Sequence, residues 1–420
     1  MELSCKPQEY KNNMEISAAE KMTQSETSKG ITPTWGAVVS MALCAFVLIA
    51  SEFLPVSLLT PIATDLHITE GYAGQSISVS GLFALATSLF ISALIGGADR
   101  RRVGLFFTSL MAVSGCMVAF APNATVLMVG GALLGMTIGG FWSISAAIMM
   151  RLVPKESVPK ALAILNGGNA LATTIAVPLG SFLGSIIGWR GAFFCVVPLA
   201  VISFIWQWKS LPHLPPERQT KHAKDVFKLL SQRRFALGMI AVMLLFMGQF
   251  MLFTYLRPFL EVVTKSNDSL LSLILLGVGI AGFVGTYLID ILLKTHLYSL
   301  LISIPAVMAV VGIALIFNVS CVLTTSLLLA VWGLIGTAAP VGWWTWLSKT
   351  LPEDAEAGGG LMVAVIQLAI TLGAVIGGVL FDHWGYATTF TFAAMILFTA
   401  AMVAFITWHD SRARLIPQTV

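Results

Sequence analysis

Charged residues are what this sequence most conspicuously lacks. Asp, Glu, Lys and Arg make up 10% of its 420 residues, whereas about 25% is usual in soluble globular proteins. Apolar residues take their place, since 57% of the chain is hydrophobic and the mean hydropathy is +0.88. So little charge excludes a water-exposed globular surface, and the sequence predicts an all-α integral membrane protein.

Motifs for cofactor, nucleotide and metal chemistry are also missing. The sequence contains no glycine-rich nucleotide loop, no H-E-x-x-H motif and no cluster of metal ligands. The cysteines Cys5, Cys44, Cys116, Cys195 and Cys321 are far apart and form no C-x-x-C pair, so we interpret them as small packing residues. We therefore expect no ATP hydrolysis, no cofactor and no metal.

An enzyme or a sensor is disfavoured on similar grounds. An intramembrane enzyme needs a paired nucleophile and base at membrane depth, and a sensor needs an output domain of appreciable size; the sequence offers neither. The first 34 residues are polar and have no apolar core of a signal peptide. We expect them to form a cytoplasmic tail, with the first span acting as the insertion signal.

Long apolar segments are abundant. A helix needs about 20 apolar residues to cross a bilayer, and twelve segments satisfy this requirement. They cover residues 35–63, 72–97, 103–121, 125–150, 160–187, 190–208, 235–262, 270–292, 297–317, 322–348, 359–381 and 387–408. The sequence thus predicts twelve transmembrane helices.

One long polar segment divides these spans into two sets of six. Residues 209–234 contain three prolines and seven Lys or Arg, which is typical of a solvated linker. The domains predicted on either side are two six-helix bundles, 35–208 and 235–408, each of 174 residues, with a C-terminal tail at 409–420. Equal lengths indicate an internal repeat.

Two weak internal matches support that repeat. The string "EFLP" at 52–55 corresponds to "YLRP" at 255–258, and "GWRGAFF" at 188–194 corresponds to "HWGYATTF" at 383–390. Two pseudo-symmetric bundles related in this way are typical of transporters that rock about a central site.

The distribution of positive charge predicts the orientation. With the N-terminus in the cytoplasm, 21 of the 24 Lys and Arg residues lie on the cytoplasmic side, and Arg190, Arg257 and Lys265 lie outside. Cytoplasmic loops are enriched in Lys and Arg. We therefore expect both termini and the linker to be cytoplasmic, with the protein in the cell inner (plasma) membrane.

The fifth span carries a motif of known type. Its sequence "AVPLGSFLGSIIGWRGAFF", 176–194, resembles the antiporter motif of the major facilitator superfamily, in the branch that exports drugs and metabolites. Pro178 removes a backbone donor, and the small residues Gly180 and Gly184 permit close helix approach. The resemblance implies the fold of that superfamily, with a tightly packed pivot here; ordinary small-residue packing is the alternative.

The loop after the second span follows the same family less closely. The family pattern is G-x-L-x-D-R-x-G-R-R, and the sequence here is "SALIGGADRRRVG", 92–104. Gly96 stands where the family has Asp, and Asp99 where it has Gly. We assign Asp99, Arg100, Arg101 and Arg102 to a gating loop at the cytoplasmic side; a simple topology anchor is the alternative.

The fourth span departs in a second way, because Gly131 occupies the slot in which the family commonly has Arg. Four longer strings, "EFLPVSLLTPIATDL", "GGFWSISAAIMMRLVPKESVPKAL", "GQFMLFTYLRPFL" and "PVGWWTWL", together with "AVIQLA", resemble the family of bacterial purine ribonucleoside exporters. That resemblance implies export of nucleosides such as inosine and guanosine in exchange for protons. Proton-driven efflux of drugs or sugars on the same fold is the alternative.

Glu52 is the one acid well inside a predicted span. Counted at 1.5 Å per residue from Trp35, it lies about 25 Å along its helix, at a depth where a charged carboxylate costs about 2.5 to 3.5 kcal/mol. Burial favours the protonated form, so a change in hydration can load or release a proton. We predict that Glu52 couples transport to protons; a structural acid bonded to Ser51 or Ser57 is the alternative.

Other charges lie near span ends, where they are typical of the membrane interface. Arg257 and Glu261 are four residues apart, a spacing that permits an ion pair on one helix face. Arg257 opposite Glu52 is the alternative pairing, and Asp290 is assigned to an interface.

A purine nucleoside needs stacking surfaces and hydrogen-bonding groups in an apolar cavity. The candidates at membrane depth are Phe141, Trp142, Ser143, Asn169, Gln249, Phe250, Thr254, Tyr255, Trp343, Trp344 and Gln367. Amides also join helices, and Trp also lies at membrane interfaces. We expect a monomer in the lipid bilayer, with purine nucleosides and protons as its partners and no nucleic acid.

Overall fold

The computed structural model describes residues 34–94, 98–215, 229–265, 267–318, 321–351 and 355–413. Every regular element in these ranges is a helix. The N-terminal tail up to residue 33, residues 216–228 of the linker and residues 414–420 of the C-terminal tail lie outside the described residues.

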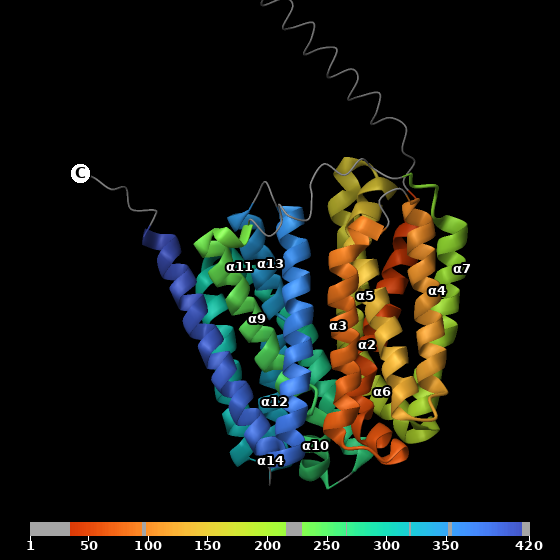
Figure 1. The fold of residues 1–420 in the computed structure, drawn as a ribbon. Helices are drawn as coiled ribbons and strands as arrows, with labels where there is room; N and C mark the ends of the chain where they lie inside the picture. Colours follow the sequence, from red (N-terminus) through yellow and green to blue (C-terminus); the bar gives the residue numbers. More distant parts are fainter. Residues whose placement is uncertain are drawn as a thin grey trace, which may run out of the picture.

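Two bundles of helices stand side by side (Figure 1). The first contains α2 (Trp35–Leu66), α3 (Glu70–Leu94), α4 (Arg100–Ala119), α5 (Ala124–Leu152), the short 3-10 helix η1 (Lys155–Ser157), α6 (Val158–Phe194) and α7 (Val196–Ser210). The second contains η2 (Leu229–Ser231), α9 (Arg233–Phe253), α10 (Leu256–Thr264), α11 (Asp268–Phe317), α12 (Val322–Gly336), α13 (Ala339–Thr350) and α14 (Ala355–Ala413). We call them the N-terminal half and the C-terminal half.

Each half has its own apolar core. One cluster consists of buried apolar residues of the N-terminal half, between Ala37 and Leu214, together with Tyr255 of the C-terminal half. The other consists of buried apolar residues of the C-terminal half, between Phe235 and Ala404, together with Val56, Ile77 and Val177 of the N-terminal half. The four side chains that belong to the opposite cluster mark where the halves touch. Helices that are apolar on every face are expected inside a membrane protein.

Ten described helical segments are long and apolar enough to cross a membrane. Two of them, Lys160–Ser210 and Gly358–Asp410, have 51 and 53 residues, about twice the length that one crossing needs. Gly188 and Gly385 interrupt them with φ of 74° and 77°, a left-handed region that glycine adopts readily. In Figure 1 the two limbs of α14 run in opposite directions. The twelve predicted crossings require each long segment to cross twice, so that number stays a prediction.

Two predicted spans are each one membrane-type segment, Arg233–Thr264 and Val322–Thr350, but each contains a short interruption of the helix. The span at 235–262 is α9 and α10, separated at Thr254 and Tyr255, and the span at 322–348 is α12 and α13, separated after Gly336. Proline clashes with the carbonyl group four residues before it. Thr254 and Gly336 are the residues four before Pro258 and Pro340, so the prolines account for both breaks.

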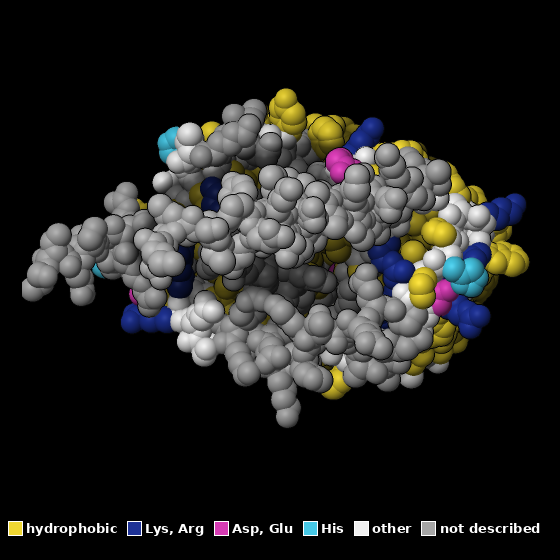
Figure 2. Space-filling model, turned by 90° about the horizontal axis from the view of Figure 1, so that it is seen from above, with side chains coloured by type: hydrophobic (Ala, Val, Ile, Leu, Met, Phe, Trp, Pro, Cys, Tyr) yellow, Lys and Arg dark blue, Asp and Glu magenta, His cyan; other side chains and the backbone are white. Residues whose placement is uncertain are grey.

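The hydrogen bonds between the halves gather at one end of the helices, which we call the far face. They join Ser57, Thr69, Gly71 and Ser181 of the N-terminal half to Arg257, Ser272 and Asp382 of the C-terminal half. The opposite end, which carries residue 34 and the end of α14, we call the terminus face. Figure 2 views that face.

Basic side chains are concentrated at the terminus face, where Lys and Arg appear in dark blue (Figure 2). The helix ends there carry Arg100, Arg101, Arg102, Arg151, Lys160, Lys209, Arg233, Arg234 and Lys349. Arg190, Arg257 and Lys265 lie towards the far face. The charge bias read from the sequence is therefore a difference between two faces of the fold.

Candidate functional site

Glu52 lies on α2, and its partner comes from the other half. Its carboxylate lies near the side-chain amide of Gln367 on α14. Ser51 and Ser57, the neighbours considered in the sequence, instead donate to the backbone carbonyl groups of Val47 and Leu54. This acid therefore faces the C-terminal half and is not capped by hydroxyls of its own helix.

Several buried polar atoms of α14, α9 and the break after α9 lack a protein partner. Within the described ranges, these include Oε1 of Gln367, Oε1 of Gln249 and the hydroxyl of Thr254. Gln249 is anchored by its amide nitrogen, which lies 3.4 Å from the carbonyl oxygen of Gly336 at the break between α12 and α13. A buried polar atom without a partner costs about 1 to 3 kcal/mol, so each of these atoms could accept or donate a hydrogen bond if a polar ligand reached it.

The interface between halves contributes one more such atom. The hydroxyl of Ser78 on α3 is buried without a partner. Ser78 lies on the face of α3 between Gly74 and Gly81, where Gly74 approaches Tyr255 and Gly81 approaches Thr371. Both halves thus provide unsatisfied polar groups at their contact.

Phenylalanine rings join the two halves next to Glu52. Phe53 of α2 stacks on Phe250 of α9 with ring centroids 6.1 Å apart and an interplanar angle of 25°, and it meets Phe253 edge-on at 5.9 Å. Phe250 was predicted from the sequence as a candidate for substrate binding, whereas Phe53 was not. Its position directly after Glu52 was the available signal.

Tyr255, at the break between α9 and α10, is fully buried. Its hydroxyl donates to the carbonyl oxygen of Ala374 at 2.9 Å, and its ring stacks on Phe381 with centroids 5.1 Å apart. A side chain with both its ring and its hydroxyl occupied by α14 is a packing element. The geometry therefore gives Tyr255 less freedom to bind substrate than Thr254 beside it.

The aromatic candidates Phe141 on α5 and Trp343 on α13 are packed inside the apolar cores. Phe141 is 1% exposed in the N-terminal core and meets Trp142 edge-on. Trp343 is 2% exposed in the C-terminal core and meets Trp346 edge-on, and Trp346 stacks on Phe235. These contacts favour packing over binding.

The remaining candidates are more accessible. Trp344 is exposed and its ring lies beside Gly359 of α14. Ser143 is exposed and its hydroxyl donates to the carbonyl oxygen of Gly139 on its own helix. Asn169 is half-buried on α6, one residue after Gly168, which contacts α2 at Ala42.

Arg257 is buried, whereas its place near a span end predicted an interfacial charge. Its Nε lies 2.8 Å from Oε1 of Glu261, so the two residues form the i, i+4 ion pair that their spacing permits. The guanidinium also donates to the carbonyl oxygen of Ser57 and to the hydroxyl of Ser181, both in the other half. Asp290 lies in α11, and its side chain lies outside the described residues.

The predicted pivot of the fifth span packs on the helix that carries Glu52. A Cβ added to Gly180 would lie 2.4 Å from Oγ of Ser57, and one added to Gly184 would lie 2.4 Å from Cδ2 of Leu58. Pro178 lies inside α6, two residues before Gly180. Small residues on α6 thus let it contact α2 closely.

The empty arginine slot of the fourth span also has a steric explanation. A Cβ at Gly131 would lie 3.0 Å from the backbone oxygen of Ser76 on α3. The α5 and α3 backbones are therefore too close for a long side chain at this position. Within this arrangement, an Arg from position 131 cannot serve as the partner of Glu52.

Asp99 fastens the basic loop at the terminus face. Burial opposes its ionisation, but hydrogen bonds from the backbone N–H groups of Arg101 at 2.8 Å and Leu214 at 3.1 Å, and a contact with His213 at 2.7 Å, outweigh burial and lower the pKa of the Asp99 carboxyl. Asp99 is thereby the N-cap of α4.

The neighbouring arginines continue this connection within the N-terminal half. The backbone N–H of Arg100 donates to the carbonyl oxygen of Leu214, and the side chain of Arg101 donates to that of Trp208. Arg102 is exposed. These bonds attach the first residues of the linker to the start of α4.

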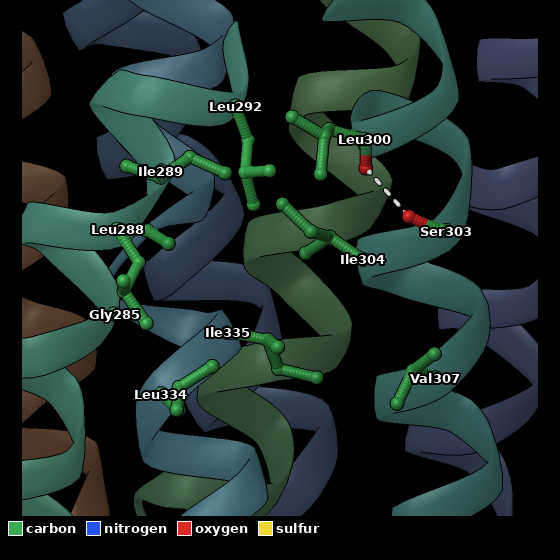
Figure 3. A pocket seen from close by; sticks show the side chains of 11 residues that line it. Gly285, Leu288, Ile289, Leu292, Leu300, Ser303, Ile304, Val307, Leu334 and Ile335 are labelled. Atoms are coloured by element: carbon green, nitrogen blue, oxygen red, sulfur yellow. Dashed lines mark hydrogen bonds between the residues drawn. The ribbon is translucent and has the colours of Figure 1, made fainter. Parts of the chain in front are cut away.

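A separate cavity of about 150 Å³ lies inside the C-terminal half (Figure 3). The two limbs of α11 and helix α12 line it with Leu, Ile and Val side chains, and Ser303 bonds to its own helix at the carbonyl oxygen of Leu300. This lining contains no titratable group, so the cavity is unsuited to proton coupling and is distinct from the Glu52 site.

Half-buried Glu52 thus lies at the contact between the two helical halves, near Gln367 and next to the Phe53–Phe250 ring pair. The family model described as the Major Facilitator Superfamily matches residues 41–360, well over half of the chain. The chain belongs to this superfamily. It is accordingly a multi-pass membrane transporter and not an enzyme.

Named relatives extend over nearly the whole chain. "Transcription regulatory protein OpdE" of Pseudomonas aeruginosa is 52% identical over 377 residues, which is 89% of this chain and 94% of that protein. "Purine ribonucleoside efflux pump NepI" of Salmonella typhimurium is 43% identical over 373 residues, again 89% of this chain and 94% of that protein. The NepI protein of Salmonella paratyphi A matches to the same extent.

Solved structures agree on the fold of this superfamily. The crystal structure of a mutant of the nucleoside transporter NupG covers 89% of this chain and 99% of its own, with a TM-score of 0.72. Sequence identity is 13%, so the likeness concerns the fold alone. The all-helical major facilitator architecture expected from the sequence is confirmed.

Proposed function

We propose that this transporter exports purine ribonucleosides, such as inosine and guanosine, in exchange for protons. The observation that carries the proposal is the contact of Glu52 with Gln367 across the two halves, next to buried polar atoms that lack a partner. The substrate class comes from the NepI relatives, which are named as purine ribonucleoside efflux pumps.

Glu52 is the proposed proton carrier. When ionised, its carboxylate accepts a hydrogen bond from the amide N–H of Gln367; when protonated, it no longer needs that donor. A bare carboxylate at membrane depth is costly, so loss of its donor favours uptake of a proton. Proton and substrate thereby compete for one polar site, which is the requirement for exchange.

The unpaired atoms fit the chemistry of a nucleoside. The oxygens of Gln249 and Gln367 accept hydrogen bonds, and a nucleoside offers N–H groups on its base and hydroxyls on its ribose. Phe53 and Phe250 supply aromatic faces for the flat base, an arrangement typical of aromatic recognition. These residues, together with Thr254, are the proposed binding set.

Transport proceeds by rocking of the two halves about this site. By the positive-inside rule, the basic terminus face lies in the cytoplasm, which is the side from which an exporter loads its substrate. The protein acts as a monomer in the bacterial inner membrane, with both termini in the cytoplasm.

We do not propose that this chain regulates transcription, although the OpdE relative is named as a transcription regulatory protein. Glu52 and the unpaired oxygens lie within membrane-type helices, where a nucleic acid has no access. A bound small molecule that crosses between halves accounts for such a site directly.

Uptake of radiolabelled inosine into everted membrane vesicles tests the substrate. We expect accumulation that requires an imposed proton gradient and is inhibited by unlabelled guanosine. No movement of inosine, together with gradient-driven movement of a drug or a sugar, would overturn the nucleoside assignment and leave the transporter assignment in place.

A further inference from the structure

Asp382 ends the first limb of α14 and reaches the start of a helix in the other half. Its Oδ2 accepts a hydrogen bond from the hydroxyl of Thr69 at 2.6 Å, and its Oδ1 accepts one from the backbone N–H of Gly71 at 2.9 Å. A Cβ on Gly71 would lie 2.3 Å from Oδ2 of Asp382. Glycine at position 71 is thus what lets the carboxylate come this close.

The group that Asp382 contacts is the N-terminus of α3, which begins at Glu70. The first N–H groups of a helix have no acceptor within the helix and carry partial positive charge. The Thr69 hydroxyl accepts from the N–H of Tyr72 at 3.0 Å while it donates to Asp382. One half of the transporter therefore caps a helix of the other half with a full negative charge.

The surrounding charges limit how strong this cap is. Glu70 on α3 experiences the negative charges of Asp382 and of Glu261 on α10, and like charges oppose approach of the halves. Arg257 partly balances them through its ion pair with Glu261. The cap thus holds against repulsion, which suits a contact that must open in every transport cycle.

Asp382 is also the exposed member of the bonds that join the halves. The bonds of Arg257 to Ser57 and Ser181 are buried, and that of Ser272 to Ser181 is partly buried, whereas the Asp382 side chain is exposed at the far face. Water reaches the Asp382 bonds without separation of the helices. They are therefore placed to break first.

We propose that Asp382 is a gating latch, which keeps the far face closed by capping the N-terminus of α3. Opening of that face requires the carboxylate to leave Thr69 and Gly71. The proposal needs the transporter fold but does not depend on Glu52 as proton carrier or on nucleosides as substrates.

Electron paramagnetic resonance distances between spin labels test the latch. Phe120 at the end of α4 and Phe317 at the end of α11 are 70% and 79% exposed, and both lie at the far face in different halves. Labels at Phe120→Cys and Phe317→Cys, in a background without native cysteines, report far-face opening in lipid nanodiscs. Two hydrogen bonds to a charged group are lost in Asp382→Ala, so we expect the ratio of long to short distances to rise at least about tenfold.

Matched variants separate the latch from general destabilisation. Asp382→Asn and Thr69→Val should raise the long-distance population in the same direction, and Thr69→Ser, which keeps the hydroxyl, should not. Asp65→Asn, which alters a carboxylate bonded within the N-terminal half, should leave the distribution unchanged. Unchanged distances in Asp382→Ala and Thr69→Val, or an equal shift in Asp65→Asn, would overturn the proposal.

Discussion

The two halves use their far-face charges differently. In the N-terminal half, Arg190 bonds to Asp65 and, at 2.8 Å, to the carbonyl oxygen of Ala121, while Trp189 donates to the same aspartate, so these bonds stay inside the half. In the C-terminal half, Arg257 and Asp382 bond across to the partner half. Internal bonds persist in every conformation, whereas bonds across must break in each cycle. Loss of the first kind should change stability alone, and loss of the second should also change which face is open.

The largest effect expected is on Glu52, which gives the N-terminal half its proposed titratable group. Glu52→Gln removes the proton site, so we expect gradient-driven nucleoside export in proteoliposomes to fall to the level of empty liposomes, while substrate exchange without a gradient continues. Substrate-dependent proton movement, followed with a pH dye, is the measurement. Tyr255→Phe, at the corresponding place in the C-terminal half, is the control and should keep coupling. Full coupling in Glu52→Gln would refute the assignment.

The next largest effect should be a difference in thermal stability between variants of Arg257 in the C-terminal half and of Arg190 in the N-terminal half. Arg257→Leu leaves Glu261 without its buried partner, and breaking such a pair costs about 3 to 5 kcal/mol. Arg190→Leu breaks a pair whose side chains are 39% and 45% exposed, for which about 0 to 1 kcal/mol is usual. Thermal unfolding in detergent should therefore show a much larger fall in melting temperature for Arg257→Leu. Equal falls would contradict the contrast between the halves.

The closely packed interior of the N-terminal half gives a third test. Gly131→Ala puts a methyl group 3.0 Å from the Ser76 oxygen, and overpacking of this kind costs about 1 to 3 kcal/mol. Gly131→Arg, which restores the residue that the family commonly has, should prevent accumulation of folded protein. Gly167→Ala is the matched control, because no atom lies within 4 Å of its added Cβ and alanine favours helix by about 1 kcal/mol. Measured melting temperatures that fall alike in Gly131→Ala and Gly167→Ala would count against the steric explanation.

The smallest effect concerns pH and the terminus face. Asp99 has a lowered pKa in the folded protein, so its contribution to stability is complete above the unfolded value near 3.8 and disappears as pH falls through the folded value. In a His213→Gln background, which removes the imidazole in contact with Asp99, the difference in melting temperature between Asp99 and Asp99→Asn should thus be constant from pH 8 to pH 5 and vanish in stronger acid. A difference that grows on acidification would show that the sign is wrong.

Sequence patterns predicted the fold well because hydropathy alone decides which segments enter a bilayer. They did not predict the breaks at Thr254 and Gly336, since prolines at 55, 61, 178 and 305 lie in helices that continue past them. The effect of a proline depends on whether neighbouring helices support the distorted turn, and one sequence does not contain that information.

The candidate site was predictable by residue type but not by partner. A lone carboxylate at membrane depth identified Glu52, and amides identified Gln249 and Gln367. The contact between Glu52 and Gln367 joins residues more than 300 positions apart, which no local pattern specifies. Trp343 and Phe141 stay predictions, although their burial in the cores favours packing, because an aromatic ring in a core and one in a binding site have the same local sequence.

The breaks in α9 and α12 give the C-terminal half a mechanical character of its own. Each is a point where a helix can bend more easily, because the proline that follows cannot donate the backbone hydrogen bond of a regular helix. The short helix α10, which carries Arg257, follows such an interruption and contacts α2 of the N-terminal half. Helix α2, by contrast, contains two prolines and is not interrupted. A rocking motion would therefore be expected to bend the interrupted helices of the C-terminal half more than the continuous helix α2 of the N-terminal half.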